Sequence, residues 1–231
     1  LLTELDLCVE GISSVAFLAQ YGNLTKLTLN VNKVASLQGM QTLSQLVTLS
    51  IKDNKLTNID ALASLHALKF CYLDSNKITS LLPLNGLHNI SILTANSNLI
   101  ADMPVLQCSS LSRLELCRNR ITAIPAYSLR YLPNLTHLNM SSNQINTVCG
   151  ETLSMCSLLQ TLIFSENHLT CVPAPLRLPL LRNLRLNMNR IENVDAWVHK
   201  GGVDGGNGDS STGTSGSSTG GGSGSANTYP L

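Results

Sequence analysis

The chain has 231 residues and a formal net charge of +1, and 43% of its residues are hydrophobic while only 4% are aromatic. Leucine occupies 43 positions and asparagine 22, far above average usage. The near-zero charge excludes a dedicated nucleic-acid-binding domain, which needs a basic patch. The apolar runs are far shorter than the roughly 18 residues of a membrane span, so no transmembrane helix is expected. No leader pattern is visible, and because the chain starts at Leu1 instead of Met, we expect a fragment or a processed form.

An internal repeat dominates the sequence. The pattern Leu-x-x-Leu-x-Leu-x-x-Asn-x-Leu, with Ile, Val or Met at some apolar positions, recurs nine times at intervals of 21 to 24 residues. Glu10 takes the asparagine position in the first copy. The asparagines of the other eight copies are Asn32, Asn54, Asn76, Asn98, Asn119, Asn143, Asn167 and Asn189. So regular a pattern predicts a solenoid of stacked coils.

Each copy contains a strand pattern followed by a turn and a short helical pattern. Leu27 and Leu29 alternate with polar residues, which is typical of a half-buried strand. The asparagine that follows can donate and accept hydrogen bonds in a turn, so the stacked asparagines are predicted to form a buried structural row, the asparagine ladder. Farther on, apolar residues such as Ile59, Leu62 and Leu65 recur every three positions, which predicts a short helix or 3₁₀ turn.

These motifs resemble the leucine-rich repeat family over about residues 1–200. The resemblance implies an α/β solenoid, a horseshoe with a curved parallel β-sheet on the concave face and short helical or 3₁₀ turns on the convex face. Repeats two to four are most similar to the 22-residue class named for a regulatory subunit of protein phosphatase 1. Repeat six, from Ile121 to Leu135, resembles the 24-residue class common in receptor ectodomains.

We expect two regions along the chain. Residues 1–200 form the solenoid of about nine repeats, with Trp197 as a core lid on the last coil. Residues 201–231 are expected to form a disordered tail or linker, because 21 of the 27 residues from Gly201 to Asn227 are Gly, Ser or Thr.

The chemistry-bearing residues are scattered. Seven cysteines without a C-x-x-C pair predict no metal site, and unpaired thiols favour a reducing, cytoplasmic location. Four Asn-x-Ser/Thr triplets allow an extracellular alternative, although such triplets arise by accident in this composition; they begin at Asn23, Asn89, Asn134 and Asn139. No catalytic motif is present, so we expect neither an enzyme nor a cofactor.

Side chains between the strand leucines should point outward on the concave face. In the middle copies these positions hold aromatic and charged residues, which are typical of a protein-binding patch. The candidate partner-binding residues are Phe70, Tyr72, Asp74, Ile92, Arg113, Glu115 and His137. The alternative is that Phe70 and Tyr72 only cover each other on the protein surface.

The sequence therefore favours a non-enzymatic scaffold that binds a protein partner on its concave sheet, as a monomer. The resemblance implies a regulatory or a cytoskeletal or ciliary adaptor, although a fold does not define a function. Two alternatives stay open: an extracellular recognition module, and a targeting domain of a longer enzyme.

Overall fold

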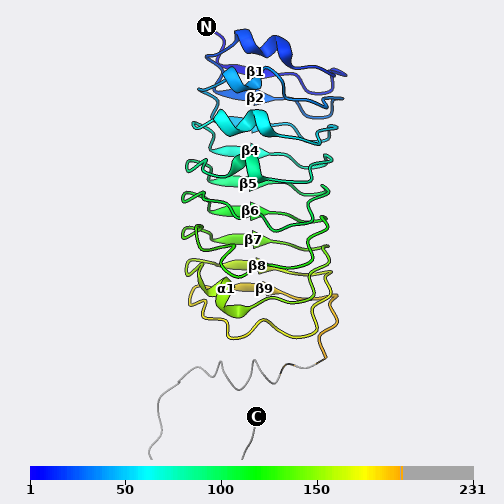
Figure 1. Ribbon diagram of the computed structural model, residues 1–231, viewed down its shortest axis with the longest axis vertical. Coiled ribbons are helices and arrows are strands. Elements are labelled where there is room, and N and C mark those ends of the chain that lie inside the picture. Colours follow the sequence, from blue (N-terminus) through cyan, green and yellow to red (C-terminus); the bar gives the residue numbers. More distant parts are fainter. Residues whose placement is uncertain (193, 195–231) are drawn as a thin grey trace, which may run out of the picture.

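The computed structural model describes residues 1–192 and 194, and within them nine short parallel strands form one sheet in chain order. Figure 1 shows the strands stacked one above the next, each belonging to one turn of the chain. We call the turn that contains strand βn coil n. The strands are β1 (Glu4–Asp6), β2 (Lys26–Thr28), β3 (Thr48–Ser50), β4 (Phe70–Tyr72), β5 (Ile92–Thr94), β6 (Arg113–Glu115), β7 (His137–Asn139), β8 (Thr161–Ile163) and β9 (Asn183–Arg185).

The strands pair in register, so equivalent positions of the repeat lie side by side. Leu49 of β3 pairs with Cys71 of β4, which in turn pairs with Leu93 of β5. These three central side chains are fully buried, while both neighbours of each central residue lie on the opposite face of the sheet. Parallel pairing in strict chain order confirms the predicted solenoid.

Short helices return the chain on the other side of the core. They are η1 (Ala16–Gln20), η2 (Met40–Thr42), η3 (Asp60–Ser64), η4 (Leu82–Leu84) and α1 (Gly150–Ser154), of which the first four are 3₁₀ helices. In coil 3 the buried residues of the return are Ile59, Leu62 and Leu65. Their spacing of three matches a 3₁₀ turn, so one apolar face points inward along the whole return.

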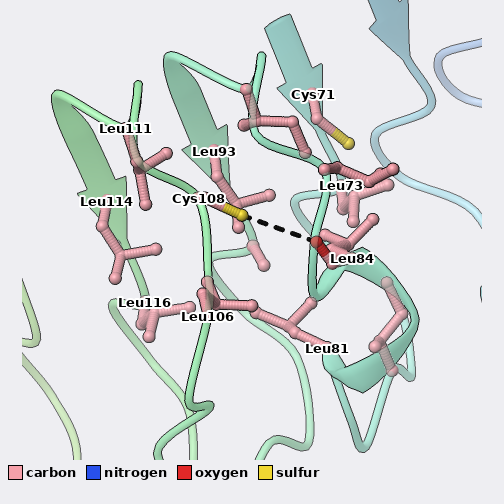
Figure 2. Packing of buried hydrophobic residues seen from close by; sticks show 14 of the residues in the cluster. Cys71, Leu73, Leu81, Leu84, Leu93, Leu106, Cys108, Leu111, Leu114 and Leu116 are labelled. Carbon is pink, nitrogen blue, oxygen red and sulfur yellow. Dashed lines mark hydrogen bonds between the residues drawn. The ribbon is translucent and has the colours of Figure 1, made fainter. Parts of the chain in front are cut away.

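The core is a continuous column of leucine and isoleucine side chains between the sheet and the helices. In Figure 2, Leu93 and Leu114 extend from the strands toward Leu81 and Leu106 of the returning segments. The buried Cys108 thiol donates to the Leu84 carbonyl at 3.5 Å. Burial raises the thiol pKa of Cys71 to about 12 and that of Cys108 to about 11, so these cysteines act as small apolar core residues.

The turn after each strand is held by one asparagine side chain. The Asn76 amide nitrogen donates to the carbonyls of Leu73 at 3.1 Å and Asp74 at 3.2 Å in its own coil. It also donates to the Ile51 carbonyl of the preceding coil at 2.9 Å, while its oxygen accepts from the Leu56 backbone N–H at 3.0 Å. One side chain thus satisfies backbone groups in two successive coils.

The same arrangement repeats along the solenoid. Each asparagine donates to a carbonyl of the preceding coil at 2.7 to 3.0 Å. The residue before each asparagine adopts a left-handed backbone conformation, as in Ser75 with φ 56° and Ser97 with φ 54°. This left-handed residue turns the backbone so that the asparagine side chain points into the solenoid, beneath the strand. The buried ladder asparagines are Asn32, Asn54, Asn76, Asn98, Asn119, Asn143 and Asn167, and Asn189 of the last coil is half-buried.

Two expectations concern parts of the chain outside the described residues. The lid role of Trp197 and the disordered tail at 201–231 both lie there, so they stay predictions.

Replacing one ladder asparagine tests how much it stabilises the stack. We expect Asn76→Ala to lower the free energy of unfolding by about 1–3 kcal/mol, because the Leu56 N–H loses its acceptor and three carbonyls each lose one of their donors. Urea denaturation followed by circular dichroism measures the change. Asn146→Ala is the matched control, since the exposed Asn146 side chain accepts only a hydroxyl bond from Thr147 at 3.2 Å. Equal destabilisation by the two substitutions would contradict the ladder's role.

Candidate protein-interaction surface

Six of the seven candidate residues occupy two parallel rows on the outward face of the sheet, and the seventh, Asp74, lies just after β4. Strand register places Phe70 beside Ile92, Ile92 beside Arg113, and Arg113 beside His137. The second row holds Tyr72, Thr94, Glu115 and Asn139 in the same four strands, β4 to β7. Because neighbouring strands are about 4.8 Å apart, the residues of each row form one continuous surface.

A shallow hollow of about 420 Å³ lies on this face. It is lined by Lys52, Tyr72, Asp74, Ile92, Thr94, Asn96, Arg113 and Glu115. Five of the seven candidate residues therefore meet in one depression. The other two, Phe70 and His137, extend the first row at its two ends, one beside Ile92 and one beside Arg113.

The aromatic residues of the patch are half-buried. Lys52 places its ammonium group 5.0 Å from the centre of the Tyr72 ring and 3.1 Å from an Asp74 carboxylate oxygen. The cation thereby contacts both a π face and a carboxylate, which restrains the Tyr72 ring. A partly immobilised aromatic side chain loses less conformational entropy when a partner covers it.

The Asp74 carboxylate connects coil 4 to coil 5. One oxygen accepts the Thr94 hydroxyl at 2.7 Å, and the other accepts the Asn96 backbone N–H at 2.9 Å. Together with the Lys52 ion pair, these bonds hold Asp74 in one orientation. Asp74 therefore supports the shape of the hollow as well as contributing charge to its edge.

Glu115 organises the far side of the hollow. Its Oε1 accepts from Arg113 Nε at 2.8 Å and lies 3.4 Å from His137 Nε2, and its Oε2 accepts from the Asn139 amide at 3.3 Å. Burial of His137 and, second, the nearby Arg113 cation lower the pKa of His137 below its ordinary value of 6.5, and the Glu115 charge only partly offsets them. The imidazole is consequently neutral at pH 7.

Three residues that line the hollow are absent from the sequence-based candidates. Lys52, Thr94 and Asn96 complete its floor and edge. Lys52 and Asp74 occupy the same position after consecutive strands and carry opposite charges, so this ion pair could have been found by aligning the repeats. The bonds from Thr94 and Asn96 to Asp74 depend on side-chain rotamers, which the pattern does not reveal.

The arrangement suits noncovalent recognition. It combines apolar area from Tyr72 and Ile92 with two ion pairs, one between successive coils and one within β6. Within residues 1–192 and 194, no cluster of three His, Cys, Asp or Glu side chains could hold a metal ion. No helix in this described part is long and apolar enough to cross a membrane.

Three of the four Asn-x-Ser/Thr triplets have an asparagine whose side-chain amide already donates a hydrogen bond. Asn89 donates to the His66 carbonyl and Asn134 to the Ser109 carbonyl, both at 2.8 Å. Asn139 donates to Glu115 on the concave face. A glycan would replace one of the two hydrogens on each of these nitrogens and leave the other for the bond, so both interpretations of the triplets stay open.

Comparisons with known proteins agree with this architecture. A family model described as leucine rich repeat matches residues 109–169. The chain is 42% identical over 91 residues to an uncharacterized leucine-rich repeat-containing protein of Schizosaccharomyces pombe, covering 38% of the chain and 14% of that protein. It is 35% identical over 98 residues to the Homo sapiens leucine-rich repeats and immunoglobulin-like domains protein 3, covering 40% of the chain and 8% of that protein. The chain thus matches only a small part of either relative's length.

Solved structures extend the likeness to most of the chain. An internalin from Listeria monocytogenes superposes with a TM-score of 0.52 at 21% identity, covering 84% of this chain and 70% of that one. The leucine-rich repeat domain of APL1B gives a TM-score of 0.61 at 23% identity, covering 79% and 60%. The fold is a leucine-rich repeat horseshoe. The assignment of repeats two to four to the phosphatase-regulator class stays a prediction.

The titration of His137 tests the electrostatics of the leucine-rich repeat surface. We expect an NMR titration to give a midpoint below 6.5, because burial and Arg113 disfavour the imidazolium. Since the native protein then binds this proton more weakly than the unfolded chain, the His137 contribution to stability is present above pH 6.5. It is lost as the pH falls from 6.5 through the native pKa. His137→Gln should remove this part of the pH dependence, and His168→Gln, at an exposed site, serves as control. A midpoint at or above 6.5 would contradict the assignment.

Proposed function

We propose that the concave sheet of coils 3 to 7 binds a protein partner and that the chain acts as a non-enzymatic scaffold. The observation that carries this proposal is the hollow of about 420 Å³, in which five of the candidate residues converge. The concave face presents side chains from successive strands in fixed rows, so a partner meets a surface that is already arranged.

Apolar side chains supply the centre of the proposed interface. Phe70, Tyr72 and Ile92 lie on adjacent strands β4 and β5, and each is half-buried before any partner arrives. Aromatic residues at the centre of an interface commonly provide most of its binding free energy once water is excluded around them. We therefore assign the anchoring role to Phe70 and Tyr72.

Charged pairs surround this centre. The Lys52–Asp74 pair lies on one side and the Arg113–Glu115 pair on the other, so the hollow carries both signs in equal number. A partner that matches this surface needs an apolar projection flanked by one acidic and one basic group on each side. Such complementarity favours specificity and register more than affinity.

The cysteines support a reducing, cytoplasmic setting for the scaffold. All seven cysteines lie within the described residues, and each is a free thiol. Three are buried in the core, where burial also raises the pKa of the Cys156 thiol to about 12. A role as a regulatory, cytoskeletal or ciliary adaptor follows only from the family resemblance and is part of this proposal.

Removing the aromatic anchors tests the proposed interface. The protein retained by the chain from an extract of its native source is identified and purified, and its affinity is measured by calorimetry. We expect the double variant Phe70→Ala and Tyr72→Ala to weaken binding by about 2 kcal/mol or more, roughly 30-fold, because the central apolar contacts are lost.

Leu82→Ala is the control, since Leu82 is 69% exposed but belongs to η4 on the opposite side of the solenoid. It should bind the partner as the parent does, and circular dichroism should show that both variants remain folded. A double variant that retains the parent affinity would refute the concave interface.

A further inference from the structure

The edge of the solenoid where the chain enters the strands carries charge of one sign. We call it the entry flank, comprising residues 19–25, 43–47, 65–69, 85–91, 106–112, 129–136, 155–160 and 177–182, which precede the strands β2 to β9. These segments contain no Asp or Glu. Their basic and histidine side chains are His66, Lys69, His88, Arg130, Arg177 and Arg182.

The opposite edge, where the chain leaves the strands, is mixed in sign. Lys33, Asp53, Lys55, Arg118 and Glu166 all lie in its turns. In a chain of net charge +1, an edge without any acidic residue over eight successive coils is a segregated electrostatic surface. Its four formal charges, Lys69, Arg130, Arg177 and Arg182, are all positive, so the flank attracts anionic groups where these side chains lie.

A cavity of about 310 Å³ opens on the entry flank of coils 4 to 6. It is lined by His88, Gln107, Ser109, Arg130, Tyr131 and Pro133, none of which is acidic. It lies before the strands β5, β6 and β7, whereas the concave hollow is built from the strands and the residues after them. The two depressions share no residue.

The cavity lies where the length of the coils changes. Asn98 and Asn119 are 21 residues apart, and Asn119 and Asn143 are 24 residues apart, so a short return is followed directly by a long one. Gln107 and Ser109 belong to the short return, and Arg130 and Tyr131 to the long one. The cavity therefore lies at the junction of a 21-residue and a 24-residue coil.

The Arg130 guanidinium is positioned by aromatic rings. Its central carbon lies 5.0 Å from the centre of the Tyr131 ring and 5.8 Å from that of Tyr127. Tyr131 is 40% exposed and Tyr127 is 60% exposed. Among the described residues no carboxylate lies within 4 Å of Arg130, so its planar donor fork remains available for an incoming carboxylate.

We propose that this cavity is a second docking site, which binds an acidic, extended peptide segment of a partner protein. A carboxylate of the segment pairs with the ring-stacked Arg130, and a neighbouring aromatic or leucine side chain enters the cavity against Tyr131 and Pro133.

Charge and shape both favour this occupant. The flank repels basic segments, and a cavity of about 310 Å³ accommodates one large side chain of a peptide. A segment that continues along the flank passes His88 on the preceding coil, where an imidazole N–H can donate to a further polar or acidic group. Two tyrosines stacked beside an arginine are typical of sites where binding free energy is concentrated.

Peptide selection on the intact chain tests the proposal. A phage-displayed library of random 12-residue peptides is panned on the parent chain, with counter-selection against Arg130→Glu. We expect the recovered peptides to be rich in Asp and Glu around one aromatic or leucine residue. A fluorescein-labelled copy of the dominant peptide should bind at least tenfold more weakly to Arg130→Glu and to Tyr131→Ala, since a charged hydrogen bond or an aromatic contact is lost.

Four control measurements test whether binding takes place in the cavity and depends on charge. Arg182→Glu lies on the same flank but outside the cavity, and it should change the affinity by less than threefold. Phe70→Ala on the concave face should leave the affinity unchanged. Replacing the acidic residues of the peptide by Asn and Gln should weaken binding at least tenfold, and raising the salt concentration should weaken it further.

Several outcomes would overturn the proposal. They are recovered peptides without acidic enrichment, equal binding of the dominant peptide to the parent and to Arg130→Glu, and loss of binding through Phe70→Ala. Binding of phosphatidylserine vesicles through Arg130 in the absence of peptide binding would also overturn it, because the flank would then be a membrane contact.

Discussion

The structure depends on how each coil satisfies the backbone of the turn that follows its strand. This turn leaves carbonyl groups that sheet pairing does not reach, and the amide of one asparagine donates to them in its own coil and in the coil before. The leucine core supplies apolar burial, but that contribution has no direction. The asparagine amide is directional, and together with the in-register pairing of the strands it fixes how one coil sits on the next.

Because the buried leucines and asparagines hold the coils together, the outward-facing side chains are free to vary. On the concave face this freedom yields the hollow around Tyr72 and Ile92, where ion pairs of both signs surround an apolar centre. On the entry flank it yields a surface of one sign with Arg130 placed against two tyrosine rings. The two surfaces have different electrostatic character and point to partners of different chemistry.

Much of the fold follows from the repeat, because the position of each leucine and asparagine determines which side of the chain is buried. The alternation also predicts correctly that Phe70, Tyr72 and Ile92 lie on the outward face of adjacent strands. The hollow itself could not be predicted, because the bonds of Asp74 to Thr94 and Asn96 depend on side-chain rotamers. The cavity at Arg130 lies where a 24-residue coil packs beside a 21-residue one, and the repeat pattern carries no such geometry. Partner binding at either surface stays a prediction.

Native-state hydrogen exchange followed by NMR tests the role of the asparagine ladder most directly. The backbone amides of Val34, Leu56 and Ile78 lie outside the strands, and each donates to the oxygen of a ladder asparagine at 2.9 to 3.0 Å. We expect their protection factors to fall within about tenfold of that of the Leu73 amide, which donates to the Thr94 carbonyl at 2.8 Å in the sheet. Exchange of these three amides at the rate of unbonded loop amides would contradict the claim that the asparagines hold the coils together.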